Sequence, residues 1–217
     1  MSQEMLVLLA ESLWETTYMV GVSAFIAALF GLPLGVILVT TDKGHVLENL
    51  VVNRVLGAIV NATRSTPFII LMVAIIPLTR LIVGTSIGTD AAIVPLSIAA
   101  IPFVGRIVES ALKEVDYGVI EAAQAMGASP LQIIAKVLIP EALPSIVLGL
   151  TITVISLIGY SAMAGAIGGG GLGDLAIRYG YQRFRADIML ATVIILIAQV
   201  QLIQSCGDWL ARRLNKK

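Results

Sequence analysis

The chain has 217 residues, of which 58% are hydrophobic and 13% are charged, and its mean hydropathy is +0.96. This composition excludes an ordinary soluble domain and predicts an integral membrane protein. The net charge of zero gives no basic field for nucleic acid, and the single cysteine excludes an intrachain disulfide.

Long uncharged stretches predict an all-α membrane protein with five transmembrane helices in a single domain, residues 1–217. About 20 apolar residues are enough to cross the hydrocarbon core of a bilayer. We expect the spans at about 13–41, 61–83, 91–111, 142–167 and 188–209. In the second span, Pro67 and Pro77 should kink the helix or break its first turn, while Arg64 and Arg80 can snorkel from its two ends.

The longest polar interruption, residues 116–141, predicts a helix pair between the third and fourth spans. Asp116 is a good N-cap for a first helix, and Gly127 stands where a left-handed C-terminal cap belongs. Ser129 can cap a second helix that begins with Pro130. An apolar stripe on that second helix would face membrane or protein; it comprises Leu131, Ile134, Val137 and Leu138. By itself, this pattern is typical of an amphipathic connector in the membrane interface.

A glycine run at 168–171 ends the fourth span, and the polar, aromatic stretch after it predicts a short interfacial helix. Gly168, Gly170 and Gly173 match the dinucleotide-binding spacing G-x-G-x-x-G, but no βαβ unit surrounds them. We therefore expect the glycines to permit a sharp turn and a close approach to another backbone, for example that of a second subunit.

The distribution of Lys and Arg predicts the orientation in the membrane. If the C-terminus is cytoplasmic, then of the 14 basic residues only Arg80, Arg178, Arg183 and Arg185 lie outside. This bias places the N-terminus outside and the insertion at 116–141 in the cytoplasm.

The sequence predicts no catalytic site and no cofactor in this chain. There is no G-x-x-x-x-G-K-[ST] phosphate cradle, no nucleophile with a positioned base, and no cluster of histidines and carboxylates at metal-ligand spacing. A transport process would then need an outside source of energy.

The insertion carries a specific signature. It reads E-A-A-x-x-x-G and is followed, after nine residues, by a branched residue, any residue, a second branched residue and a proline. The matching residues are Glu121, Ala122, Ala123, Gly127, Val137, Ile139 and Pro140. This pattern resembles the E-A-A loop of permease subunits in bacterial ABC importers, with Val137 and Ile139 where the family more often has Ile and Leu. Three further stretches are similar to the permeases of methionine importers: R-S-T-P at 64–67, A-M-G-A-S-P at 125–130 and G-G-G-G-L-G-D at 168–174.

The resemblance implies a non-catalytic, multi-pass permease of the bacterial inner membrane that moves an amino acid, and methionine in particular, into the cytoplasm. It implies a second copy of the chain, two ATP-binding subunits that hold ATP and magnesium, and an extracytoplasmic binding protein; Tyr179, Tyr181, Arg183 and Arg185 are candidate contacts for the last. The residues expected to dock on the ATPase are Glu121, Ala122, Ala123, Gly127, Ala128, Ser129, Pro130, Leu131 and Gln132. Glu121 has an equally weighted alternative role, in which it ties the loop to a nearby Arg or Lys.

In the fourth span, Thr153, Ser156, Tyr160 and Met163 recur at helical spacing and predict one partly polar face. Such a face is costly in lipid and favours a subunit interface or a pore. Ser156, Tyr160 and Met163 would then form a soft apolar gate suited to a thioether, whereas ordinary helix packing explains the pattern about as well.

Three alternatives stay open, and the last two belong to other classes of function. The chain could carry another amino acid or small polar solute, or it could be an ion-coupled secondary transporter, although no carboxylate lies deep in a span and the two halves show no repeat. It could also be a membrane scaffold that uses the loop only to bind a cytoplasmic partner.

Overall fold

The computed structural model describes residues 3–215, and this part of the chain contains helices and no strands, as predicted. The helices are α1 (Gln3–Thr40), α2 (Leu50–Ser65), α3 (Phe68–Ala74), α4 (Ile76–Val83), α5 (Thr89–Lys113), α6 (Tyr117–Ala125), α7 (Pro130–Ile133), α8 (Ile139–Gly165), α9 (Gly171–Leu175) and α10 (Ala186–Leu214). Two π-helical turns, Ile134–Leu138 and Ala176–Tyr181, follow α7 and α9.

Four helical segments of the described chain are long and apolar enough to cross a membrane: α1, α5, the run Pro130–Gly165 and α10. The bent pair of α2 and α3 makes a fifth crossing if it is counted as one span. The second span, expected at about 61–83 with a kink or break at its prolines, is broken: α2 and α3 are bent by 103° relative to each other. Thr66 is extended there, since a residue before proline is pushed out of the helical region, and Pro77 stands in the first turn of α4.

The second helix of the predicted pair is not a separate element. It continues from Pro130 through the π-helical turn into α8, so the fourth span is longer than expected. The wide turn comes just before Pro140, which has no N–H to donate, so the chain stays helical across the boundary expected between the insertion and the fourth span. In the apolar stripe, Leu131 is 76% exposed and so is free to face a partner, whereas Leu138 packs in the core together with Ile133.

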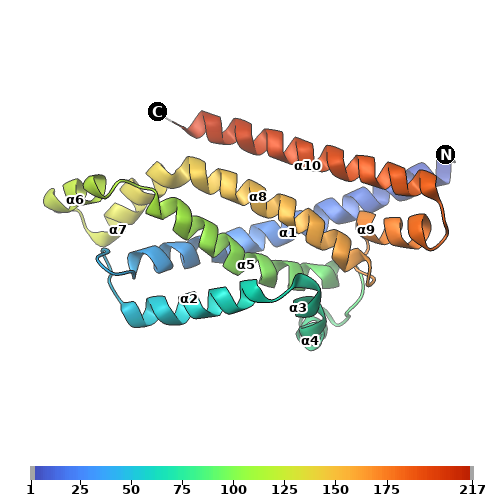
Figure 1. Cartoon of the computed structure of the whole chain (residues 1–217), viewed down its shortest axis with the longest axis horizontal. Coiled ribbons are helices and arrows are strands. Elements are labelled where there is room, and N and C mark those ends of the chain that lie inside the picture. Colours follow the sequence, from blue (N-terminus) through green and yellow to red (C-terminus); the bar gives the residue numbers. More distant parts are fainter. Residues whose placement is uncertain (1–2, 216–217) are drawn as a thin grey trace.

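The long helices lie side by side and give the molecule an elongated shape (Figure 1). The α6–α7 segment projects at one end, and α9 lies at the other end, beside the start of α1. Helices α1, α5 and α8 form the centre, and their buried side chains make one continuous hydrophobic core that includes Met19, Leu96, Val104 and Leu157. α10 packs on the outside of α8.

Small residues bring α1 and α5 into close contact. A Cβ on Gly31 would lie 2.9 Å from the carbonyl oxygen of Ile101, and one on Gly35 would lie 2.6 Å from that of Gly105. The spacing of these two glycines on α1 is the small-xxx-small pattern that lets membrane helices approach closely. The two glycines therefore fix the distance between the central helices.

Two side chains of α1 accept hydrogen bonds from the backbone at the glycine run, at the opposite end of the molecule from α6. The Glu15 carboxylate accepts from the backbone N–H of Gly171 at 2.7 Å, and the Thr16 hydroxyl accepts from that of Leu172 at 2.9 Å. Gly168, Gly170 and Gly171 all have positive φ, as the sharp turn predicted from the sequence requires. The close approach occurs within the chain, where a Cβ on Gly165 would lie 2.8 Å from the carbonyl carbon of Gly173.

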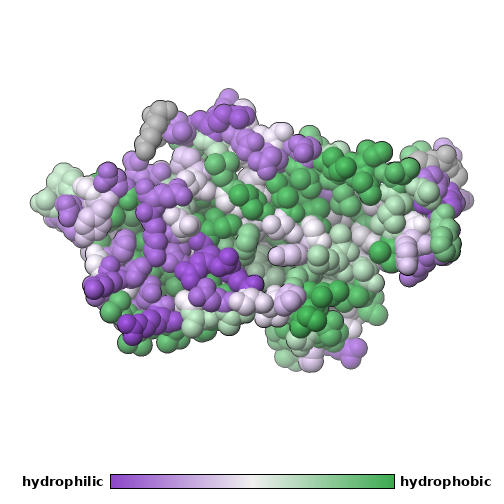
Figure 2. Space-filling model, in the orientation of Figure 1, coloured by the Kyte–Doolittle hydropathy of each residue, from purple (hydrophilic) through white to green (hydrophobic). Residues whose placement is uncertain are grey.

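The surface divides into hydrophilic and hydrophobic regions along the molecule (Figure 2). Hydrophilic residues gather toward the end that carries α6 and α7 and extend across α2 and the C-terminal half of α10, whereas hydrophobic residues cover the N-terminal half of α10 and the α3–α4 segment. On α10 the most exposed apolar side chains are Leu190, Ile194, Ile197 and Leu202. An apolar surface of this kind fits lipid or a partner helix.

Candidate functional site

The turn between α6 and α7 is fixed by its own hydrogen bonds, and the predicted caps are confirmed. The Asp116 carboxylate accepts from the N–H of Gly118 at 2.7 Å, and Gly127 has a φ of +79°. Ser129 and Gln132 form a reciprocal capping box, in which each side chain accepts from the other residue's backbone N–H. The turn is therefore preorganised by local contacts.

This turn presents most of the residues singled out in the E-A-A loop. Exposed on its surface are Glu121, Ala122, Gly127, Ser129, Pro130, Leu131 and Gln132. Ala128 is partly buried, and Ala123 is only 4% exposed, so Ala123 packs into the core beside Ile120 and cannot present a docking side chain. Within residues 3–215, no ion pair involves Glu121, so the alternative that it ties the loop to a nearby basic residue finds no support.

Sequence reasoning missed Met126, which is 82% exposed on the turn next to Gly127. A flexible thioether side chain adapts to irregular partner surfaces. The signal in the sequence was a large apolar residue directly before the helix-ending Gly127. Together, Met126 and Leu131 give the turn two exposed apolar side chains, one on each side of Gly127 in the sequence.

An ionic network lies at the same end of the molecule and connects three segments. Arg106 pairs with the buried Glu109 on α5 and also donates to the Asn61 amide oxygen on α2 at 2.8 Å. Lys113 pairs with Glu109 at 3.0 Å and with Asp42, which follows α1, at 2.9 Å. The Lys113 ammonium, with the backbone N–H of Lys43, holds the pKa of the Asp42 carboxyl below its ordinary value of 3.8. The network ties the ends of α1, α2 and α5 together next to the α6–α7 turn.

The predicted polar face of α8 is split. Thr153 is only 2% exposed, and its hydroxyl donates to the carbonyl of Gly149 at 2.9 Å, so it belongs to the interior. Steps of three, four and three residues accumulate a drift of about 80° between Thr153 and Met163 on a helix of 3.6 residues per turn. Ser156 and Tyr160 are partly exposed and Met163 is 48% exposed, so these three remain on an outward face.

Tyr160 also connects α8 to α3. Its ring stacks on that of Phe68 at the start of α3, with centroids 4.7 Å apart and an interplanar angle of 11°. The hydroxyl of Ser156 donates back to the carbonyl of Ile152 at 2.9 Å. The α8 face is thus an aromatic and thioether surface whose one serine has satisfied its donor.

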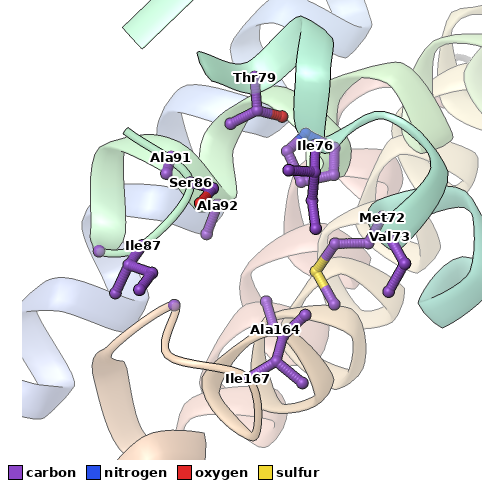
Figure 3. A pocket seen from close by; sticks show the side chains of 13 residues that line it. Met72, Val73, Ile76, Thr79, Ser86, Ile87, Ala91, Ala92, Ala164 and Ile167 are labelled. Carbon is purple, nitrogen blue, oxygen red and sulfur yellow. The ribbon is translucent and has the colours of Figure 1, made fainter. Parts of the chain in front are cut away.

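An apolar cavity of about 320 Å³ lies between the α3–α4 segment, the start of α5 and the end of α8. Figure 3 shows Met72, Ile76, Ile87 and Ala164 around it, from four different parts of the chain. Its wall includes the hydroxyl residues Thr79 and Ser86 and no charged side chain. Within residues 3–215 there is no group of three His, Cys, Asp or Glu side chains that could hold a metal ion.

Three comparisons place these features among known proteins. The family model described as "Binding-protein-dependent transport system inner membrane component" matches residues 31–217. The chain is 61% identical to the probable D-methionine transport system permease protein MetI of Vibrio cholerae, over 97% of this chain and 93% of the relative. The protein of the same name from Pasteurella multocida is 49% identical over 94% of each chain. A chain of the methionine ABC transporter MetNI in an inward-facing conformation superposes with a TM-score of 0.97 at 51% identity, covering 100% of both chains.

Proposed function

Because the chain belongs to the family of binding-protein-dependent transport system inner membrane components, we propose that its α6–α7 turn docks on an ATPase and that the outward face of α8 lines a transport path. The chain is a non-catalytic permease subunit of an ATP-driven importer in the inner membrane, and its substrate is methionine. The near-complete match to methionine permeases is the observation that carries this function.

Energy for transport enters through the α6–α7 turn. The partner subunit that docks there binds ATP with magnesium and hydrolyses it. The exposed side chains of Met126 and Leu131 supply apolar contact area, and the capping box at Ser129 and Gln132 holds the turn rigid. A rigid turn that continues directly into α8 transmits movement of the partner to the membrane helix. The coupling residues are Glu121, Ala122, Gly127, Ala128, Ser129, Pro130, Leu131 and Gln132, with Ala123 supporting them from the core.

Two copies of the chain would form the path along a two-fold axis, because a single copy leaves Ser156, Tyr160 and Met163 on an outward face. With the α2–α3 pair counted as one crossing, the described chain has five, which leaves its two ends on opposite sides. The excess of Lys and Arg at the α6–α7 end and the C-terminal end favours a cytoplasmic C-terminus and an N-terminus outside. The α9 end would then receive the extracytoplasmic binding protein. Tyr181 is 68% exposed there, and Arg183 lies over the ring of Tyr179 at 4.4 Å. Arg185 follows on the same loop.

Reconstitution in liposomes with the ATPase and the binding protein tests this function. We expect methionine uptake that requires ATP and all three components and that survives removal of proton and sodium gradients. Uptake that persists without the ATPase would instead indicate an ion-coupled transporter, and ATPase binding without any uptake would indicate a scaffold. Competition by unlabelled amino acids identifies any other substrate.

A Met163→Ala permease tests the gate formed by Ser156, Tyr160 and Met163. The shorter side chain should widen the closed path, so we expect methionine to leak from loaded liposomes without ATP. The measurement is passive efflux in the absence of nucleotide. Leu190→Ala is the control, because Leu190 is an exposed apolar residue of α10. If the Met163 variant shows the same passive efflux and the same import rate as the wild type, Met163 is not a gate.

A further inference from the structure

A second cavity, of about 140 Å³, lies where α2 ends and α3 begins. It is lined by Thr63, Arg64, Thr66, Phe68, Leu71, Ala99, Phe103 and Tyr160. Ala99 and Phe103 are the residues of α5 in this wall, and each is at least ten residues from either end of that helix. At about 1.5 Å per residue, the cavity therefore lies about 15 Å or more from both ends of a membrane-crossing helix.

Arg64 is the one charged residue in this wall. Its guanidinium lies over the Phe103 ring, 6.0 Å from the centroid, one helical turn along α5 from Arg106. The side chain is exposed on the isolated chain, and no carboxylate of residues 3–215 pairs with it. Arg106, by contrast, has both Glu109 and Asn61 as partners.

A guanidinium without a counter-charge is too costly to leave in lipid. Arg64 must therefore face a water-filled path or an anionic group in the assembled transporter. The neighbouring contacts favour the path, because Tyr160 belongs to the outward face of α8 and stacks on Phe68 in the same wall.

The remaining groups of the wall complement a zwitterion with an apolar side chain. The hydroxyls of Thr63 and Thr66 donate to the carbonyls of Ile59 and Ala62, at 3.0 and 3.2 Å, which leaves their oxygen lone pairs free to accept. The carbonyl end of α2, which carries a partial negative charge, lies at the same place. The Phe68–Tyr160 stack supplies an aromatic surface of the kind that thioether sulfur contacts favourably.

We propose that this cavity is a substrate subsite on the transport path. Arg64 binds the α-carboxylate of the amino acid, Thr63 and Thr66 accept hydrogen bonds from its ammonium group, and the Phe68–Tyr160 stack contacts its side chain. The inference rests on the proposed function, since it takes an amino acid as the substrate. The site is shallow on one chain, and the second copy closes it across the two-fold axis.

An Arg64→Gln variant in the full complex tests the subsite. Loss of a hydrogen bond to a charged group lowers binding by about ten- to a hundredfold, and we expect ATP-driven methionine uptake to fall by that factor. ATPase activity stimulated by the binding protein should stay within about twofold of wild type, because the coupling turn is unchanged. Arg64→Lys keeps the charge but loses the planar fork, so it should recover part of the uptake.

Arg54→Gln is the matched control, because Arg54 is exposed on the same helix and lines no part of this cavity. It should transport as the wild type does. The assays are run in liposomes of phosphatidylcholine alone and with an added anionic lipid. A defect of Arg64→Gln that appears only with anionic lipid would make a lipid headgroup the partner of Arg64 and overturn the subsite.

The outcomes separate the subsite from the importer function. If the wild-type complex shows no ATP-driven uptake, the proposed function fails; if the wild type transports and Arg64→Gln equals it, the importer stands and the subsite is wrong. A parallel loss of ATPase activity and uptake in Arg64→Gln would assign Arg64 a structural role and also overturn the subsite. Should that variant fail to assemble, Thr66→Val, which keeps the side-chain shape, must still lower uptake at constant ATPase activity, and unchanged uptake counts against the proposal.

Discussion

A Gly127→Asp permease is expected to assemble with its ATPase and to hydrolyse ATP while importing almost no methionine. The left-handed φ of +79° at Gly127 closes the turn between α6 and α7, and an aspartate can adopt this conformation better than most residues. A Cβ at this position meets no atom within 4 Å, so the isolated chain has room for the side chain. The new carboxylate would instead stand between Met126 and Leu131 and disturb the apolar docking surface. Loss of a central contact of this kind costs about 2 kcal/mol or more, which is about a thirtyfold loss of productive coupling.

The measurement is the ratio of methionine imported to ATP hydrolysed in liposomes. Gly84→Asp is the matched control, since Gly84 has a φ of +84°, also ends a helix, and has equal free space around its Cβ, but caps α4 away from the α6–α7 turn. The control should keep the wild-type ratio. A Gly127→Asp transporter with an unchanged ratio would show that the turn does not couple the two subunits.

A Gly35→Leu substitution is expected to prevent the permease from folding into its native bundle. The added Cβ alone would lie 2.6 Å from the carbonyl oxygen of Gly105, which is backbone and cannot swing aside, and against Val108 as well. Overpacking at a well-packed contact costs about 1–3 kcal/mol, and a branched side chain between two helix backbones is at or above the upper end of that range. The two central helices would have to separate.

The yield of monodisperse complex after detergent extraction, together with its thermal unfolding temperature, measures this effect. Gly21→Leu on the same helix is the control, because no atom lies within 4 Å of a Cβ at Gly21 and the residue is exposed. We expect wild-type yield from Gly21→Leu and little or none from Gly35→Leu. Equal yields from the two would mean that the close approach of α1 and α5 is not needed for the fold.

Features encoded by neighbouring residues were predictable. The caps at Asp116 and Ser129 and the left-handed Gly127 depend on contacts within three residues, so their residue types are sufficient signals. The long apolar stretches likewise predicted α1, α5 and α10, because a helix must satisfy its own backbone hydrogen bonds in lipid.

Features that depend on distant parts of the chain were not predictable. The sequence placed Arg106 and Glu109 three residues apart but gave no sign of Asn61 or Asp42, which reach the same network from α2 and from the loop after α1. Thr153 fitted a polar face by spacing and proved to be buried, because the packing of α8 decides which side of the helix points inward. Ala123 was likewise counted as a docking residue, although it packs in the core.

The sequence by itself determined that this protein is an all-helical membrane protein with a capped helix pair at 116–141, since composition, apolar length and capping residues act locally; its E-A-A motif carried the resemblance to importer permeases. Only the tertiary structure decided that α7 continues into α8, that the bend between α2 and α3 is as large as 103°, and that Arg64 lies beside Phe103 without an ion-pair partner in the described chain. The physical reason is that prolines permit either a break or a widened turn, and packing against neighbouring helices selects between them.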